Sequence, residues 1–252
     1  MANNDAIILK NISKKFLIYH ENRDSMYGYL TSIINKKKSS DELVVLDDIS
    51  FSVKRGEMLG IIGFNGSGKT TLLKIIAKIY TPDKGSVITN GTVTPLLALG
   101  TGFNQELSAR ENIITYGVIL GFTKKEMIEK IGEIVRFAEL DKFLDTKVKN
   151  FSAGMNARLT FSTAIQVDPD ILLLDEVLSV GDILFREKSF NALMDFRKKG
   201  KTIVFVSHQI DHVAKLCDKV IWLHDGKIRD YGQPDDVIKK YRQFAGDKSK
   251  AI

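Results

Sequence analysis

Residues 63–70, GFNGSGKT, place three glycines before a lysine and a threonine, directly after the apolar run 58–62. The glycines allow the backbone to curl so that successive N–H groups point inward, and a helix predicted over 71–79 adds the positive end of its dipole. Such a loop binds phosphate. Lys69 is placed to reach the β and γ phosphates of a nucleoside triphosphate, and the Thr70 hydroxyl to hold Mg²⁺. The expected nucleotide-binding residues here are Gly63, Asn65, Gly66, Ser67, Gly68, Lys69, Thr70 and Thr71.

Two adjacent carboxylates, Asp175 and Glu176, follow the hydrophobic run 171–174. Open α/β sheets bind ligands at the carboxyl ends of their strands, which is where this pair falls. Asp175 can hold Mg²⁺, usually through water, and Glu176 can orient or deprotonate an attacking water. An acidic pair after an apolar strand is a weak signal alone, but with the phosphate loop it predicts triphosphate hydrolysis.

A histidine and a short Ser/Gly segment complete the candidate set. His208 follows the apolar run 202–206, where a neutral imidazole can hydrogen-bond the γ phosphate, although a strand-end histidine can also be structural. Ser152 and Gly154 precede a helix predicted over 156–165. They form either a second phosphate-facing surface or simply a helix cap.

The elements that must position these residues alternate along the chain. Short strands are expected at 7–9, 49–53 and 58–62, and later at 171–174, 202–206 and 220–224, with helices between the later ones. This alternation predicts an α/β fold with a mostly parallel, buried sheet. Helical patterns dominate about 99–166, which we interpret as a helical subdomain inserted into a single domain over 1–252. A polar insert over about 20–45 contains one short amphipathic helix pattern.

Composition narrows the class of protein. At 252 residues and 44% hydrophobic content, the chain can bury a full core. No apolar run approaches the roughly 20 residues of a membrane span, and no secretory signal is readable, so a cytoplasmic protein is expected. Cys217 is the only cysteine, which excludes an internal disulfide, and packing is its expected role. The net charge of +6 is moderate, and the lysines at 36–38 fit a solvated loop better than a nucleic-acid patch.

With these motifs in place, the chain resembles the ATP-binding subunit of an ABC transporter over nearly its whole length. Residues 63–70 match the Walker A motif, 171–176 the Walker B strand with its catalytic glutamate, and 152–155 a variant signature motif. Residues 179–182 look like the D-loop, and His208 like the switch histidine. The resemblance implies an ABC-type P-loop ATPase fold with an antiparallel β subdomain. It also implies a head-to-tail homodimer in which Ser152 and Gly154 of one copy close over ATP and Mg²⁺ bound by the other.

Further residues resemble one subfamily, the exporters of O-antigen, teichoic acid and related lipid-linked polysaccharides. The matching segments are 97–103, 106–112, 168–171 and 176–182, and the insert also fits. Phe16 falls where the family places an aromatic that stacks on adenine, with Tyr19 as an alternative and a core aromatic as the other interpretation. The usual glutamine of the Q-loop would align near Leu99, and the nearest glutamine is Gln105. The chain ends where some members continue into a carbohydrate-binding domain.

We therefore expect an ATPase subunit that lies on the cytoplasmic face of the membrane. It would dimerise, dock on a permease present in two copies and drive export of a lipid-linked polysaccharide, without a nucleic-acid partner. An exporter ATPase for a lipid, drug or peptide is one alternative. A soluble ABC-type ATPase without a permease is another, although the long coiled coils or paired cassettes usual there are not readable here.

Overall fold

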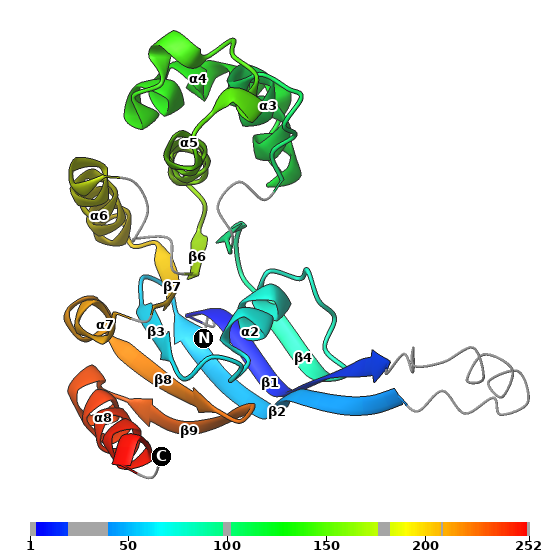
Figure 1. Cartoon of the computed structure of the whole chain (residues 1–252), viewed down its shortest axis with the longest axis vertical. Coiled ribbons are helices and arrows are strands. Elements are labelled where there is room, and N and C mark those ends of the chain that lie inside the picture. Colours follow the sequence, from blue (N-terminus) through cyan, green and yellow to red (C-terminus); the bar gives the residue numbers. More distant parts are fainter. Residues whose placement is uncertain (1–3, 20–39, 98–101, 176–181, 208, 251–252) are drawn as a thin grey trace, which may run out of the picture.

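The structure of the chain, a computed structural model, describes residues 4–19, 40–97, 102–175, 182–207 and 209–250 (Figure 1). Its strands are β1 (Asp5–Tyr19), β2 (Ser40–Lys54), β3 (Met58–Ile62), β4 (Lys84–Thr89), β5 (Val93–Leu96), β6 (Ile171–Asp175), β7 (Thr202–Val206), β8 (Lys219–His224) and β9 (Lys227–Gly232). Its helices are α2 (Lys69–Ile76), α3 (Ala109–Ile119), α4 (Lys124–Ala138), α5 (Ala153–Gln166), α6 (Ile183–Lys198), α7 (Ile210–Leu216) and α8 (Pro234–Lys250), with 3-10 turns η1 (Asp141–Phe143) and η2 (Val148–Asn150).

The strands form two sheets. The larger has the order β5-β6-β7-β3-β8-β9, parallel throughout except for the antiparallel pair β8 and β9. The smaller, β2-β1-β4, is antiparallel. Because β3, β6 and β7 run in the same direction, their carboxyl ends meet at one edge of the sheet. That edge receives the phosphate loop after β3 and Asp175 at the end of β6.

Hydrophobic layers cover both faces of the larger sheet. Side chains alternate along a strand, so β3 sends Leu59 and Ile61 to one face and Met58 and Ile62 to the other. The first face packs against α2 and the antiparallel sheet, and the second against α5 to α8. Burial on both faces explains why the central strands are unbroken apolar runs in the sequence.

Helices α3, α4 and α5 form a subdomain with a core of its own, seen at the top of Figure 1. Ser108 and Thr123 begin α3 and α4 with capping boxes. In each box the hydroxyl accepts a hydrogen bond from the backbone N–H of a glutamate three residues later, and the glutamate carboxylate accepts one from the backbone N–H of the capping residue. The subdomain lies between β5 and β6 in the chain. Across the described residues, none of the helices has both the length and the apolar character that a membrane span requires.

The antiparallel sheet differs most from expectation. β1 and β2 pair over their whole lengths, from Asp5 with Lys54 to Tyr19 with Ser40. Register shifts interrupt this ladder at several points, and each shift breaks the period-two pattern by which a strand is recognised. β2 therefore overlaps the insert expected at about 20–45, and residues 20–39 lie outside the description. The strands β4, β5 and β9 were not expected, because they are short sheet-edge segments with weak apolar patterns.

Candidate functional site

The phosphate loop connects β3 to α2 in a backbone conformation that its glycines allow. Gly63, Gly66 and Gly68 have φ values of +156°, +80° and +101°. Residues other than glycine rarely adopt such values. A Cβ at Gly63 would lie 2.2 Å from the carbonyl oxygen of Leu223 on β8, so this position also has no space for one. The loop is therefore held tightly against β8 and leads directly into the N-terminus of α2.

Lys69 is buried and folded over the loop. Its side chain is only 7% exposed, and its Nζ donates hydrogen bonds to the carbonyl oxygens of Gly63 at 2.8 Å and Phe64 at 2.9 Å. The ammonium therefore lies inside the curve of the loop. From there it can donate to phosphate oxygens, which are stronger acceptors than neutral carbonyls because they are charged.

Thr70 and Asp175 meet at the sheet edge, as the two motifs predict. The Thr70 hydroxyl donates a 2.7 Å hydrogen bond to Asp175 Oδ2, which joins the first turn of α2 to the end of β6. Hydroxyl and carboxylate oxygens suit Mg²⁺, which uses few protein ligands together with substrate phosphates. Among the described residues, no group of three or more His, Cys, Asp or Glu could hold a metal ion.

A cavity of about 320 Å³ borders the loop. It is lined by Asn65, Gly66, Gly68, Lys69, Thr70 and Thr71, together with Leu43 and Val45 from β2. The last two were not expected from the sequence. Leu43 is an apolar side chain that is nevertheless 49% exposed. Six of the eight predicted residues of the loop thus share one cavity. Of the other two, Gly63 is buried against β8, and Ser67 is buried with no hydrogen-bond partner for its hydroxyl among the described residues.

Phe16 lies close to this cavity without lining it. Its cross-strand partner is Leu43, and directly opposed residues of an antiparallel pair share one face of the sheet. Its ring meets Tyr80 edge-on at 5.7 Å between centroids, and Lys14 Nζ lies 5.5 Å from its centre. Stacking of Phe16 on adenine remains a prediction, and the side chain of Tyr19 lies outside the description.

Ser152 and Gly154 lie at the start of α5 on the helical subdomain. The Ser152 hydroxyl caps α5 by accepting from Met155 N at 3.2 Å, so the helix-cap interpretation holds for the isolated chain. Both residues line a second cavity, of about 690 Å³, that shares no residue with the one at the phosphate loop. One copy of the chain therefore does not bring the two predicted phosphate-facing surfaces into one cavity.

Glu176 and His208 lie outside the described residues, whereas Asp182, the first described residue after 176–181, has defined contacts. Arg158 on α5 pairs with Asp182, which caps α6, and with Glu139 at the end of α4 at 3.3 Å. Arg158 also lies 5.1 Å from the ring of Phe185. The helix that carries Ser152 is thereby tied to the residue that follows the segment 176–181, a link that sequence spacing did not reveal.

The sequence profile described as "ABC transporter" matches residues 46–179, more than half of the chain and including the phosphate loop and Asp175. The chain belongs to the ABC transporter family. The predicted resemblance and the enzyme class of an ABC-type ATPase are therefore confirmed.

Curated ABC transporter proteins with high similarity are ATP-binding proteins of export systems. The chain is 43% identical to the O-antigen export system ATP-binding protein RfbB of Myxococcus xanthus, over 95% of this chain and 56% of that protein. It is 40% identical to the teichoic acids export ATP-binding protein TagH of Bacillus cereus, over 96% and 43% respectively. It thus spans about half the length of these two relatives. RfbB of Klebsiella pneumoniae is 40% identical over 94% of this chain and 97% of that protein.

Solved ABC structures confirm the fold. An ATP-binding subunit of an ABC transporter superposes with a TM-score of 0.73 at 22% identity, over 94% of this chain and 93% of that chain. A dimeric ATP-binding cassette in a post-hydrolysis state, bound to ADP and Pi, gives 0.72 at 23% identity, over 90% and 98%. The predicted ABC fold, with a mostly parallel core sheet, an antiparallel β subdomain and a helical subdomain, is present.

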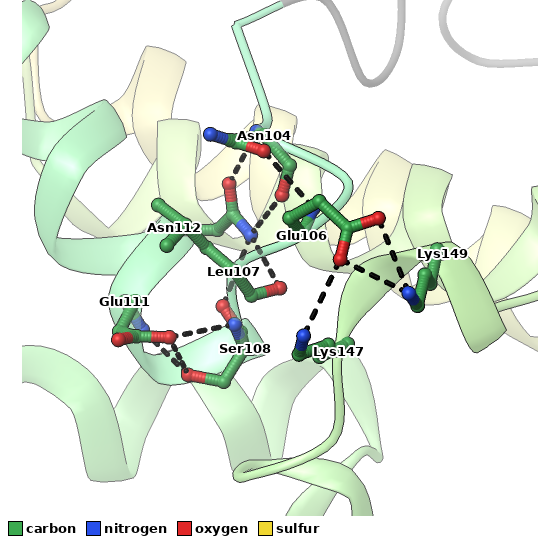
Figure 2. Close-up of polar contacts among 8 residues, drawn as sticks. All are labelled: Asn104, Glu106, Leu107, Ser108, Glu111, Asn112, Lys147 and Lys149. Carbon is green, nitrogen blue, oxygen red and sulfur yellow. Dashed lines mark hydrogen bonds and ion pairs between the residues drawn. The ribbon is translucent and has the colours of Figure 1, made fainter.

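The turn that enters the helical subdomain of this ABC protein is organised by a buried asparagine (Figure 2). Asn112 is 1% exposed. Its Oδ1 accepts from Asn104 N at 2.7 Å, and its Nδ2 donates to the carbonyl oxygens of Asn104, Leu107 and Ser108 at 2.9 to 3.1 Å. One side chain therefore satisfies four backbone groups of residues 104–108.

The same turn presents Glu106 to two lysines, as Figure 2 shows. Glu106 pairs with Lys149 at 3.0 Å and Lys147 at 3.3 Å. Hydrogen bonds from these lysines lower the pKa of the Glu106 carboxyl, and the bond from Lys149 has the larger effect. The backbone carbonyl of Gln105 accepts from Lys149 N at 3.0 Å. Gln105 is exposed, and residues 98–101, where the Q-loop glutamine would align, lie outside the description.

Replacing Asn112 with Ala should destabilise the protein by about 2–4 kcal/mol, because a buried amide and its four hydrogen bonds are lost. Asn104 N loses its acceptor, whereas the three carbonyl oxygens each keep one backbone donor. Urea unfolding followed by circular dichroism measures this. Asn150→Ala, at an exposed position of η2, is the matched control and should change the free energy of unfolding by less than about 0.5 kcal/mol. Equal stability of the two variants would contradict the organising role of Asn112.

Cys217 packs as the sequence predicted. It is buried against the second face of the larger sheet, and burial, the largest cause, raises the pKa of its thiol to about 12. A thiol with that pKa stays protonated at neutral pH and is a poor nucleophile.

Proposed function

We propose that this chain is the ATP-hydrolysing subunit of an exporter for a lipid-linked polysaccharide. Two copies bind ATP between them and drive a membrane permease from the cytoplasmic face. The similarity to O-antigen and teichoic acid export proteins supports the cargo. The observation that carries the ATPase chemistry is the contact between Thr70 and Asp175, which joins the phosphate loop to the acidic strand.

In this proposal each residue at the sheet edge has a distinct task. The backbone N–H groups of the loop and Lys69 hold the phosphates, and Thr70 and Asp175 would hold Mg²⁺. That ion, when bound, neutralises charge on the phosphates. Glu176 takes a proton from the attacking water and His208 hydrogen-bonds the γ phosphate, while Phe16 stacks on the adenine. The roles of the last three are transferred from the family by sequence position.

The second half of each ATP site comes from another copy of the chain. Ser152 and Gly154 lie in a cavity separate from the phosphate loop, so closing them over ATP requires a second protomer. The N-terminus of α5, where they lie, directs free N–H groups outward and favours an anion. A head-to-tail dimer supplies both surfaces to two ATP molecules. The similarity to a dimeric cassette in fold supports this arrangement.

The cargo can be tested by recovering the chain from native membranes in mild detergent and identifying what co-purifies by mass spectrometry. A polytopic permease accompanied by glycolipid would support polysaccharide export. A permease accompanied by a drug, peptide or simple lipid would contradict the polysaccharide cargo and identify another one. Recovery of ribosomes or DNA without a membrane protein would leave the ATPase chemistry and overturn the transport proposal.

Asp175→Asn is expected to remove the dependence of nucleotide binding on Mg²⁺. The amide oxygen can still accept from Thr70, so the local fold is retained, but a neutral ligand holds Mg²⁺ weakly. The measurement compares the Kd of a fluorescent ATP analogue with Mg²⁺ and with EDTA. The wild type and Asp141→Asn, which alters an exposed carboxylate in η1, should both bind more tightly with Mg²⁺. The same Mg²⁺ response in Asp175→Asn would exclude Asp175 as a ligand.

A further inference from the structure

Phe64, the second residue of the phosphate loop, packs onto the C-terminal helix. The cavity at the loop is lined by its neighbours Asn65 and Gly66 but not by Phe64. The Phe64 ring instead lies 5.4 Å from Tyr241 and 6.2 Å from Phe244, both on α8, measured between centroids. His224, at the end of β8, meets it edge-on at 6.0 Å.

The rings of Tyr241 and Phe244 pack against further side chains of β8 and β9. Trp222 on β8 lies 5.6 Å from Tyr241 and 5.3 Å from Phe244, and the guanidinium carbon of Arg229 lies 3.9 Å from the Phe244 ring centre. Aromatic pairs and cation–π contacts of this kind stabilise a packing arrangement beyond simple area burial.

Two salt bridges also link α8 to neighbouring elements. Lys240 pairs with Asp230 of β9, and Arg242 with Asp211 of α7, each at 2.7 Å. The helix therefore offers Phe64 a surface whose position is set by three other elements.

The backbone of Phe64 belongs to the phosphate site, although its ring does not. Its carbonyl oxygen accepts from Lys69 Nζ at 2.9 Å and from Ser67 N at 3.2 Å. On the other side, Gly63 is pressed against Leu223 of β8. A shift of the Phe64 ring would thus move the carbonyl that holds Lys69 and the turn that presents the loop amides.

We propose that α8 positions the phosphate loop through the Phe64 ring, so that Tyr241 and Phe244 set the affinity for nucleotide without touching it. They act as positioning residues, because neither lines the nucleotide cavity. The inference requires only that the loop binds nucleotide phosphate, and it is independent of the exported cargo and of any permease.

The test is the double variant Tyr241→Ala plus Phe244→Ala in the full chain, assayed for binding of a fluorescent ADP analogue with Mg²⁺. We expect an increase in Kd of about five- to tenfold, from the loss of two aromatic contacts. The matched control is Val237→Ala plus Ile238→Ala, which removes buried side chains of the same helix that belong to the core behind the sheet. This control should lower Tm but leave the Kd at its wild-type value.

Two results would overturn the proposal: a wild-type Kd in the aromatic variant, or an equal rise in both double variants, which would reflect stability alone. If the aromatic variant does not fold, Phe64→Leu provides the same test, because it removes only the ring on the loop. The conservative variant Tyr241→Phe should restore wild-type affinity.

Trp222 provides an independent readout, because it is the only tryptophan in the sequence and it contacts both α8 rings. Saturating ADP should change its emission in the wild type, and this change should be smaller in Phe64→Leu at saturation. A wild-type emission that is identical with and without nucleotide would contradict the coupling.

Discussion

Glu176→Gln is expected to lower ATP turnover by about 10²–10⁴-fold, the usual contribution of a general base, while ATP binding persists and an ATP-bound dimer accumulates. The preceding residue, Asp175, contacts Thr70 of the phosphate loop, and Glu176 follows it directly in the chain. Glutamine keeps the size and hydrogen bonding of glutamate but cannot accept the proton of the attacking water. Phosphate release measures the turnover, and size exclusion with ATP measures the dimer.

Glu187→Gln is the matched control for this change, since it neutralises an exposed carboxylate on α6. It should turn over ATP at the wild-type rate. Turnover by Glu176→Gln at that same rate would remove Glu176 from catalysis. A Glu176→Gln protein that binds ATP yet elutes only as a monomer would instead contradict the two-copy site, and leave the assignment of the base intact.

Local motifs predicted the form of the phosphate loop because its backbone is encoded in consecutive residues. The glycines of 63–70 specify a backbone that few other residues can adopt, and the lysine follows at a spacing set by that loop. The Thr70 to Asp175 contact was also predictable. Both residues follow parallel core strands, whose carboxyl ends share one edge of the sheet.

Contacts between distant segments could not be predicted in this way. Leu43 and Val45 reach the cavity at the phosphate loop only because β2 folds across the start of α2. The sequence pattern indicated only 7–9 of β1 and 49–53 of β2, because register shifts interrupt the β1 and β2 ladder. Phe64 illustrates the same limit. Nothing in the loop sequence indicates that this ring packs against Tyr241, far along the chain.

The helical subdomain contains both features that local sequence can predict and contacts that it cannot. The capping signals at Ser108 and Thr123 mark where α3 and α4 begin. The link from Arg158 to Asp182, in contrast, depends on how the subdomain meets the core. This link joins the helix that carries Ser152 to the residue that caps α6.

Lys69→Ala is expected to weaken ATP binding itself by about 10–100-fold, the effect of losing a charge-assisted hydrogen-bond donor to phosphate. The side chain is buried within the loop and donates to the carbonyls of Gly63 and Phe64, so its ammonium lies within reach of a bound phosphate. Isothermal titration calorimetry with ATP and Mg²⁺ measures the change. An ATP affinity equal to that of the wild type would remove Lys69 from its assigned role.

Lys78→Gly is the control for charge, because it removes an exposed lysine just beyond α2 at a φ of +58° that glycine accommodates. Its ATP affinity should match the wild type.

Together with Glu176→Gln, the Lys69 variant separates binding from chemistry at the same sheet edge. Loss of affinity in Lys69→Ala with retained affinity in Glu176→Gln is expected only if the loop holds the phosphates while the acidic pair acts on the water. Equal loss of affinity in both variants would mean that the two motifs form one binding site without a separate base.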